Sequence, residues 1–119
     1  MRKKNAFSDI PVRINKLLVH FGVNQKRFAL MLRVSESTVN RWQKGIGVKR
    51  VDRMLTFQKL EDLMELAKKT FSNKGIPRWY HRPNELLGRE TPIEYLIKFN
   101  DGLERVTNLI AAIRWGLPS

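Results

Sequence analysis

Apolar residues recur at three- and four-residue steps along most of this 119-residue chain, and this is the spacing of one face of an α-helix. One such stripe joins Ile10, Ile14 and Leu17, and a longer stripe runs from Val51 to Phe71. No segment shows a sustained alternation of apolar and polar residues bounded by turns, which is the pattern of a half-buried strand. The sequence therefore predicts an all-α fold.

Capping residues and glycines divide this pattern into successive helices. Asn24 and Ser35 are suited to begin a helix, and glycines such as Gly22 are suited to end one. Thr91-Pro92-Ile93-Glu94 is a capping box with proline at the first helical position. We expect helices at 9–20, 25–32, 36–43, 49–71, 78–81, 91–99 (with its cap) and 103–115, with turns at 73–77 and 100–102.

The composition excludes several kinds of function. The chain has no cysteine and only two histidines, His20 and His81, which excludes disulfides, thiol catalysis, thiolate zinc sites and a multi-histidine metal site. No apolar run approaches the roughly 18 residues of a membrane span, and no long apolar stretch follows the charged N-terminus. With no catalytic constellation in view, we expect a cytoplasmic protein that is not an enzyme and needs no cofactor.

The positive charge lies almost wholly in the first half of the chain. The net charge is +12; residues 1–50 hold 12 basic and 2 acidic side chains, whereas residues 51–119 hold 11 and 9. A fold does not require this asymmetry, which costs self-repulsion, and neutralising phosphates is a common reason to carry it. The charge therefore favours a partner that is nucleic acid, with a solvated basic surface kept for solubility as the alternative.

Residues 24–45 have the features of a helix-turn-helix. Ala29 is small enough for the next helix to cross closely, and four apolar residues are expected to fix the crossing with buried side chains: Leu32, Val34, Val39 and Trp42. Ser35 begins the second of these helices abruptly after a short turn, and its N-terminal residues are thereby placed outward, where they can enter a major groove.

This stretch resembles the helix-turn-helix of the Cro/repressor (Xre-like) family, whose pattern is Gln-x-x-x-Ala-x-x-Leu-x-Val-Ser-x-x-Thr-Val-x-Arg-Trp-x-x-Gly. The resemblance implies that Gln25 holds a phosphate. It also implies a set of residues that face base edges: Glu36, Ser37, Asn40 and Arg41. Thr38 and Lys44 would flank them as contacts to the DNA backbone. Ser35, Lys49 and Arg50 complete the predicted DNA-binding residues. Arginine with guanine and asparagine with adenine are the favoured pairings.

Two alternatives remain open for this segment. Glu36 departs from the neutral residue often found at its position, and it either accepts from a cytosine amino group or repels DNA. In the second alternative, the segment does not bind DNA, and its helices together with the preceding helix form a cluster that contacts only protein.

The second half of the chain carries a series of short motifs in order: Trp79, Pro83-Asn84, Leu87-Gly88, Thr91-Pro92, Gly102 and Gly116. Over residues 76–117 this series resembles the C-terminal toxin-binding domain of the MbcA/ParS/Xre antitoxin family. Tyr80 stands where the family often has an aliphatic residue, which implies a different contact surface there.

The two resemblances together imply a DNA-binding domain at 1–59 and a helical toxin-binding domain at 60–119. They imply an antitoxin of a type II toxin–antitoxin pair that covers the active-site cleft of a RES-domain toxin and represses its own operon. The NAD chemistry would belong to the toxin. The alternative is a stand-alone, phage-like transcriptional repressor whose C-terminal half only dimerises. A homodimer is expected in either case, since one recognition helix reads few base pairs, and exposed apolar surface on the C-terminal half would favour a missing partner.

The last residues of the chain combine basic, aromatic and aliphatic groups at a free end. Tryptophan and arginine are frequent interface anchors, so the tail is suited to enter a pocket of the partner. The predicted partner-binding residues are Arg114, Trp115, Leu117, Pro118 and Ser119. In the alternative, Trp115 and Leu117 pack back on Trp79 or on the fourth helix.

Overall fold

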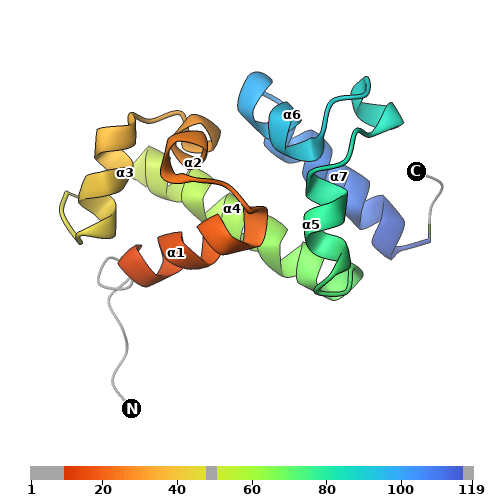
Figure 1. Cartoon of the computed structure of the whole chain (residues 1–119), viewed down its shortest axis with the longest axis horizontal. Helices are drawn as coiled ribbons and strands as arrows, with labels where there is room; N and C mark the ends of the chain where they lie inside the picture. Colours follow the sequence, from red (N-terminus) through yellow and green to blue (C-terminus); the bar gives the residue numbers. More distant parts are fainter. Residues whose placement is uncertain (1–9, 48–50, 117–119) are drawn as a thin grey trace, which may run out of the picture. The chain divides into compact units, whose positions relative to one another are not determined.

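The computed structural model describes residues 10–47 and 51–116, and for residues 51–54 it describes the backbone alone. The elements in chain order are α1 (Ile10–Phe21), α2 (Gln25–Leu32), α3 (Glu36–Gln43), α4 (Val51–Thr70), α5 (Gly75–Tyr80), the 3₁₀ turn η1 (Glu85–Leu87), α6 (Pro92–Lys98) and α7 (Gly102–Arg114). No strand occurs within the described ranges, and the prediction of an all-α fold is confirmed (Figure 1).

The chain divides into two compact units, residues 1–58 and 59–119, and the division falls inside α4. This boundary lies one residue before the one expected from the sequence. The assignment of DNA binding to one unit and toxin binding to the other stays a prediction. Over the described residues, no helix combines the length and the apolar character that crossing a bilayer requires.

The N-terminal unit packs α3 against both α1 and α2. Phe28 and Trp42 are buried at its centre, as expected, and the Phe28 ring meets Phe57 edge-on with 6.4 Å between centroids. Each fully buried large apolar side chain contributes about 1.5–3 kcal/mol. The buried apolar side chains of this unit are Ile10, Ile14, Leu17, Phe21, Phe28, Ala29, Met31, Leu32, Val39, Trp42 and Phe57.

The C-terminal unit packs α6 against α7 and α5 against α6, and Figure 1 shows α6 lying along α7. The predicted N-cap of α6 is confirmed, because the Thr91 hydroxyl accepts the Glu94 amide at 3.0 Å, and Pro92 is the first helical residue; the reciprocal bond of the Glu94 carboxylate stays a prediction. The buried apolar side chains of this unit are Leu60, Leu63, Met64, Ala67, Ile76, Tyr80, Leu87, Ile93, Leu96, Val106 and Ile110.

Two expected turns are wrong, because the following helices begin earlier. The turn predicted at 73–77 already contains the start of α5, where the Ser72 hydroxyl accepts the Gly75 amide at 3.1 Å. Pro77 lies in the first turn of that helix, where its missing N–H costs nothing. Gly102 is the first residue of α7 rather than a turn residue.

Gly102 is needed for contact between helices. A Cβ atom added to it would lie 2.5 Å from the Tyr95 carbonyl oxygen and 3.0 Å from the Leu96 Cα atom. Because these are backbone atoms of α6, they cannot swing aside as a side chain would. Gly102 therefore permits the close approach of α6 and α7.

Candidate functional sites

Short-range hydrogen bonds stabilise the starts of α2 and α3 and the turn between the two helices. The Asn24 side chain accepts the Arg27 amide at 2.8 Å, and the Ser35 hydroxyl accepts the Thr38 amide at 3.1 Å. Between these caps, Arg33 adopts the left-handed conformation with φ of 62°, and the Val34 amide donates to the Ala29 carbonyl at 3.0 Å. The two helices, their caps and the tight turn at Arg33 are as the sequence predicts.

α3 has one buried side and one polar, exposed side. Val39 and Trp42 are buried, with 0% and 3% of their surfaces exposed. Most of the residues predicted to face DNA lie on the exposed side of α3 and at its end: Glu36, Ser37, Asn40, Arg41 and Lys44. The structure thus leaves these side chains accessible, while their contact with DNA stays a prediction.

Three hydroxyl residues of the predicted DNA-binding set contact one another at the start of α3. The Ser35 and Thr38 hydroxyl oxygens lie 2.8 Å apart, and the Ser37 hydroxyl lies 3.1 Å from that of Ser35. A guanidinium nitrogen of Arg41 donates to the Thr38 hydroxyl at 3.4 Å. The first turn of α3 and the guanidinium group of Arg41 are therefore linked by one chain of polar contacts.

Gln25 is positioned by residues that the sequence did not single out. Its amide nitrogen donates to the Gln43 side-chain oxygen at 2.6 Å, and the Gln43 amide nitrogen donates to the Asn15 side-chain oxygen at 3.4 Å. This chain joins the start of α2, the end of α3 and the exposed side of α1. Three amide side chains from separate helices carry no local signal that would predict their meeting. Lys49 and Arg50, also predicted to bind DNA, lie outside the described residues.

Aromatic residues cluster around α5 in the C-terminal unit. The Trp79 ring stacks on Phe71, with 5.4 Å between centroids, and meets the Tyr80 ring edge-on at 5.5 Å. Tyr80 is fully buried, and desolvation raises the pKa of its phenol above the usual range. The expectation that Tyr80 alters a contact surface is wrong, because a side chain with no exposed surface belongs to the core.

A hydrogen bond joins the end of α7 to the end of α4. The Arg114 guanidinium donates to the Lys69 carbonyl oxygen at 2.7 Å, and it also lies over the Trp115 ring, 5.7 Å from the centroid. Trp115 itself is 72% exposed, so packing of this ring back onto Trp79 or α4 is wrong. The other predicted tail residues, Leu117, Pro118 and Ser119, lie outside the described residues.

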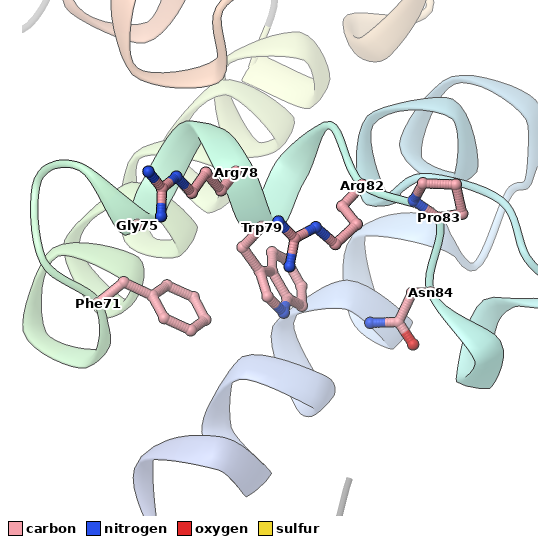
Figure 2. Close-up of a pocket in the computed structure, with 7 residues that line it drawn as sticks. All are labelled: Phe71, Gly75, Arg78, Trp79, Arg82, Pro83 and Asn84. Carbon is pink, nitrogen blue, oxygen red and sulfur yellow. The ribbon is translucent and has the colours of Figure 1, made fainter.

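A hollow of about 200 Å³ opens beside this aromatic cluster. Figure 2 shows the Arg82 and Asn84 side chains directed toward the Trp79 ring, the Phe71 ring facing Trp79 from the end of α4, and the Arg78 side chain extending along α5 toward Gly75. Among the residues that the structure describes, none that lines the hollow is acidic. Arg78 and Arg82 are not among the site residues predicted from the sequence, because their spacing of four residues marks two positive charges near Trp79 but not the hollow that they line.

Exposed apolar side chains do not single out the C-terminal unit. Leu86, Phe99 and Trp115 are exposed there, but the N-terminal unit also exposes several, including Val12 and Val19. This criterion therefore does not separate an antitoxin from a stand-alone repressor. Among the described residues, no group of three or more histidine, aspartate or glutamate side chains is placed to hold a metal ion.

The C-terminal unit matches a known domain in sequence. Residues 71–116 match the model of the antitoxin Xre/MbcA/ParS C-terminal toxin-binding domain. A probable mycobacterial cidal antitoxin of Mycobacterium tuberculosis is 34% identical over 79 residues. The chain belongs to the Xre/MbcA/ParS antitoxin family. The alignment with this relative spans 66% of each protein, so about a third of the relative has no counterpart in it.

The fold of this antitoxin-family chain also has a solved counterpart. It resembles a chain in the crystal structure of the M. tuberculosis MbcT–MbcA toxin–antitoxin complex, with a TM-score of 0.68 and 18% sequence identity. The superposition covers 98% of this chain and 100% of the other. At this identity the similarity establishes the shared fold of both units.

Proposed function

We propose that this protein is the antitoxin of a type II toxin–antitoxin system and that it neutralises a RES-domain toxin through its C-terminal unit. The observation that carries the proposal is the match of residues 71–116 to a toxin-binding domain, because this segment falls entirely within the compact unit 59–119. The 34% identity to a probable antitoxin supports the same function. NAD consumption belongs to the toxin, and this chain acts by covering the toxin's active-site cleft rather than by catalysis or with a cofactor of its own.

The proposal includes repression of the protein's own operon by the N-terminal unit. This half carries most of the +12 charge, and α3 exposes Ser37, Asn40 and Arg41 on the side opposite its buried residues. Charge of this kind supplies salt-dependent phosphate binding, and asparagine and arginine supply base readout. Two copies of the chain would place two recognition helices about 34 Å apart, so the operator is expected to be palindromic.

The first test isolates the partner. A tagged copy of the protein is captured from its native host in high salt with added nuclease, so that contacts bridged by DNA are lost, and the captured proteins are identified by mass spectrometry. We expect a stoichiometric RES-domain protein whose expression alone depletes NAD and stops growth. A homodimer without any partner would contradict the antitoxin function and leave a repressor with a C-terminal dimerisation module.

Arg41→Ala tests base readout. Arg41 is exposed on α3, and loss of one base-reading arginine should weaken operator binding by about 1–3 kcal/mol. Binding is measured by fluorescence anisotropy at fixed salt against operator and scrambled duplexes. Lys16→Ala on α1 is the matched control for loss of one positive charge, and it should weaken binding to both duplexes alike. Operator affinity that is unchanged in Arg41→Ala would remove this residue from the base-reading set.

Two truncations test the tail. Deleting residues 114–119 should abolish neutralisation of the toxin while leaving operator binding intact, whereas deleting only 117–119 retains the Arg114 bond to Lys69 and the exposed Trp115. The readouts are growth after induction of the toxin and operator binding. Full protection by the 114–119 deletion would exclude the tail as the blocking element.

A further inference from the structure

The hollow beside Trp79 combines apolar walls with unpaired positive charge. Phe71 and Trp79 form its aromatic side, stacked at an interplanar angle of 28°. Arg78 and Arg82 are both exposed and lie along its rim. Neither guanidinium has a hydrogen bond or an ion pair with any residue in the described parts of the chain. This differs from Arg89, Arg105 and Arg114, which are all engaged within the unit.

The Asn84 side chain adds an oriented donor to the same wall. Its oxygen accepts the Leu86 amide at 2.9 Å, which fixes the carboxamide and leaves its nitrogen directed into the hollow beside Trp79, as Figure 2 shows. The side-chain donors of the lining are therefore two guanidinium groups, this amide and the indole N–H of Trp79. A ligand with oxygen acceptors and a negative charge matches this arrangement, because a guanidinium group binds a carboxylate through paired hydrogen bonds.

The position and size of the hollow indicate a protein side chain as the occupant. All of its lining residues fall within the segment that matches the toxin-binding domain. Its volume of about 200 Å³ accommodates one side chain and its flanking backbone. Interfaces are commonly anchored where an aromatic or arginine residue meets a partner group in a pocket that water is excluded from.

We propose that the hollow formed by Phe71, Arg78, Trp79 and Arg82 receives an aspartate or glutamate side chain of the partner toxin. The Arg82 guanidinium binds the carboxylate, Arg78 contributes a second positive charge at the rim, and the aliphatic part of the side chain contacts the Trp79 ring. This inference rests on the proposed antitoxin function, and it adds a contact on α5 that is separate from the C-terminal tail. The tail would enter a pocket of the toxin, whereas the hollow would receive a side chain of the toxin.

The test is the affinity of the full-length protein for the toxin recovered in the capture experiment, measured by calorimetry or biolayer interferometry. Arg78→Glu combined with Arg82→Glu should weaken binding at least about 30-fold, because removing or reversing one partner of a desolvated charge pair leaves the other charge unpaired. Lys59→Glu is the matched control: it reverses an exposed charge of the same unit, roughly 17 Å along α4 from Thr70. This control should change affinity less than about threefold.

A neutral variant is needed as well, because the charge-reversed variant could lose binding through a folding defect. Arg78→Gln with Arg82→Gln should weaken binding about tenfold with an unchanged circular dichroism spectrum and thermal midpoint, since both side chains are exposed. It should also flatten the salt dependence of toxin binding, because screening acts on the charge pairs that it lacks. Wild-type affinity in the neutral variant, or loss of operator binding in place of toxin binding, would overturn the proposal.

The outcomes separate this inference from the function on which it rests. If the wild-type protein binds no toxin, the antitoxin function itself fails. If the wild-type protein and both arginine variants bind the toxin equally well, the antitoxin function stands and the hollow is not a contact site.

Discussion

The α2–α3 segment and the α5–α7 segment are both built from short helices, but the hydrogen bonds that start α2 and α3 are local, whereas arginine side chains of α7 donate to distant backbone carbonyls. In α2–α3, the caps at Asn24 and Ser35 join residues only three positions apart. In the C-terminal unit, the Arg114 bond to Lys69 spans 45 positions, and Arg105 reaches the Leu86 carbonyl across 19. Local capping specifies where a helix starts, whereas distant contacts specify what that helix packs against.

This difference explains why the first segment is readable from the sequence and the second only in part. A serine or asparagine before a helix has one main local use, so its hydrogen bond can be anticipated. A glycine such as Gly102 has two uses, a turn and a close approach, and the sequence alone does not distinguish them. Substitutions in each segment test this difference.

The largest expected effect is at Gly102. Alanine favours a helix over glycine by about 1 kcal/mol, so a purely local argument predicts that Gly102→Ala stabilises the protein. The added Cβ would instead lie 2.5 Å from the Tyr95 carbonyl oxygen, and we expect a loss of about 1–3 kcal/mol in the free energy of unfolding, measured by urea denaturation. Asn108→Ala, at an exposed position of the same helix, is the control and should not destabilise. A stabilised Gly102→Ala protein would show that α6 and α7 do not approach this closely.

The next effect concerns the buried phenol of Tyr80. Burial raises the pKa of the Tyr80 phenol in the folded state, so the phenol of the unfolded chain loses its proton at lower pH. The contribution of Tyr80 to the free energy of unfolding is therefore fully present below pH about 10 and is lost progressively above it. The slope contributed by one such group is up to about 1.4 kcal/mol per pH unit. Tyr80→Phe should remove this part of the alkaline slope, as measured by urea denaturation from pH 8 to 11. Tyr95→Phe leaves Tyr80 in place and should retain it; equal slopes in all three proteins would contradict the burial of Tyr80.

The smallest effect is the cap of α3. Ser35→Ala removes the acceptor of the Thr38 amide and should cost about 1 kcal/mol of stability. Ser37 lies two residues later and makes no cap bond to a backbone amide, so Ser37→Ala should lower the stability by less. Both are measured by thermal melting under identical conditions. If Ser37→Ala were the more damaging, the local hydrogen bonds described for α3 would not be what fixes its start.

The sequence predicted the all-α class, the caps of α2, α3 and α6, and the core positions of Phe28 and Trp42. It also marked the exposed residues of α3, since alternation of buried and exposed positions within a short capped helix follows from its period. It missed the Gln25–Gln43–Asn15 chain and the hollow around Trp79. Both depend on how separate helices are brought together, and no residue type or spacing within one helix encodes such a meeting.

The most direct test of the central claim is a titration of the isolated toxin with the full-length protein while NAD is followed in solution. If the C-terminal unit covers the toxin's active site, NAD consumption should fall in proportion to added protein and stop at a fixed stoichiometric ratio. The variant without residues 114–119 should leave NAD consumption running. Undiminished loss of NAD in a tenfold excess of the wild-type protein would contradict the antitoxin function.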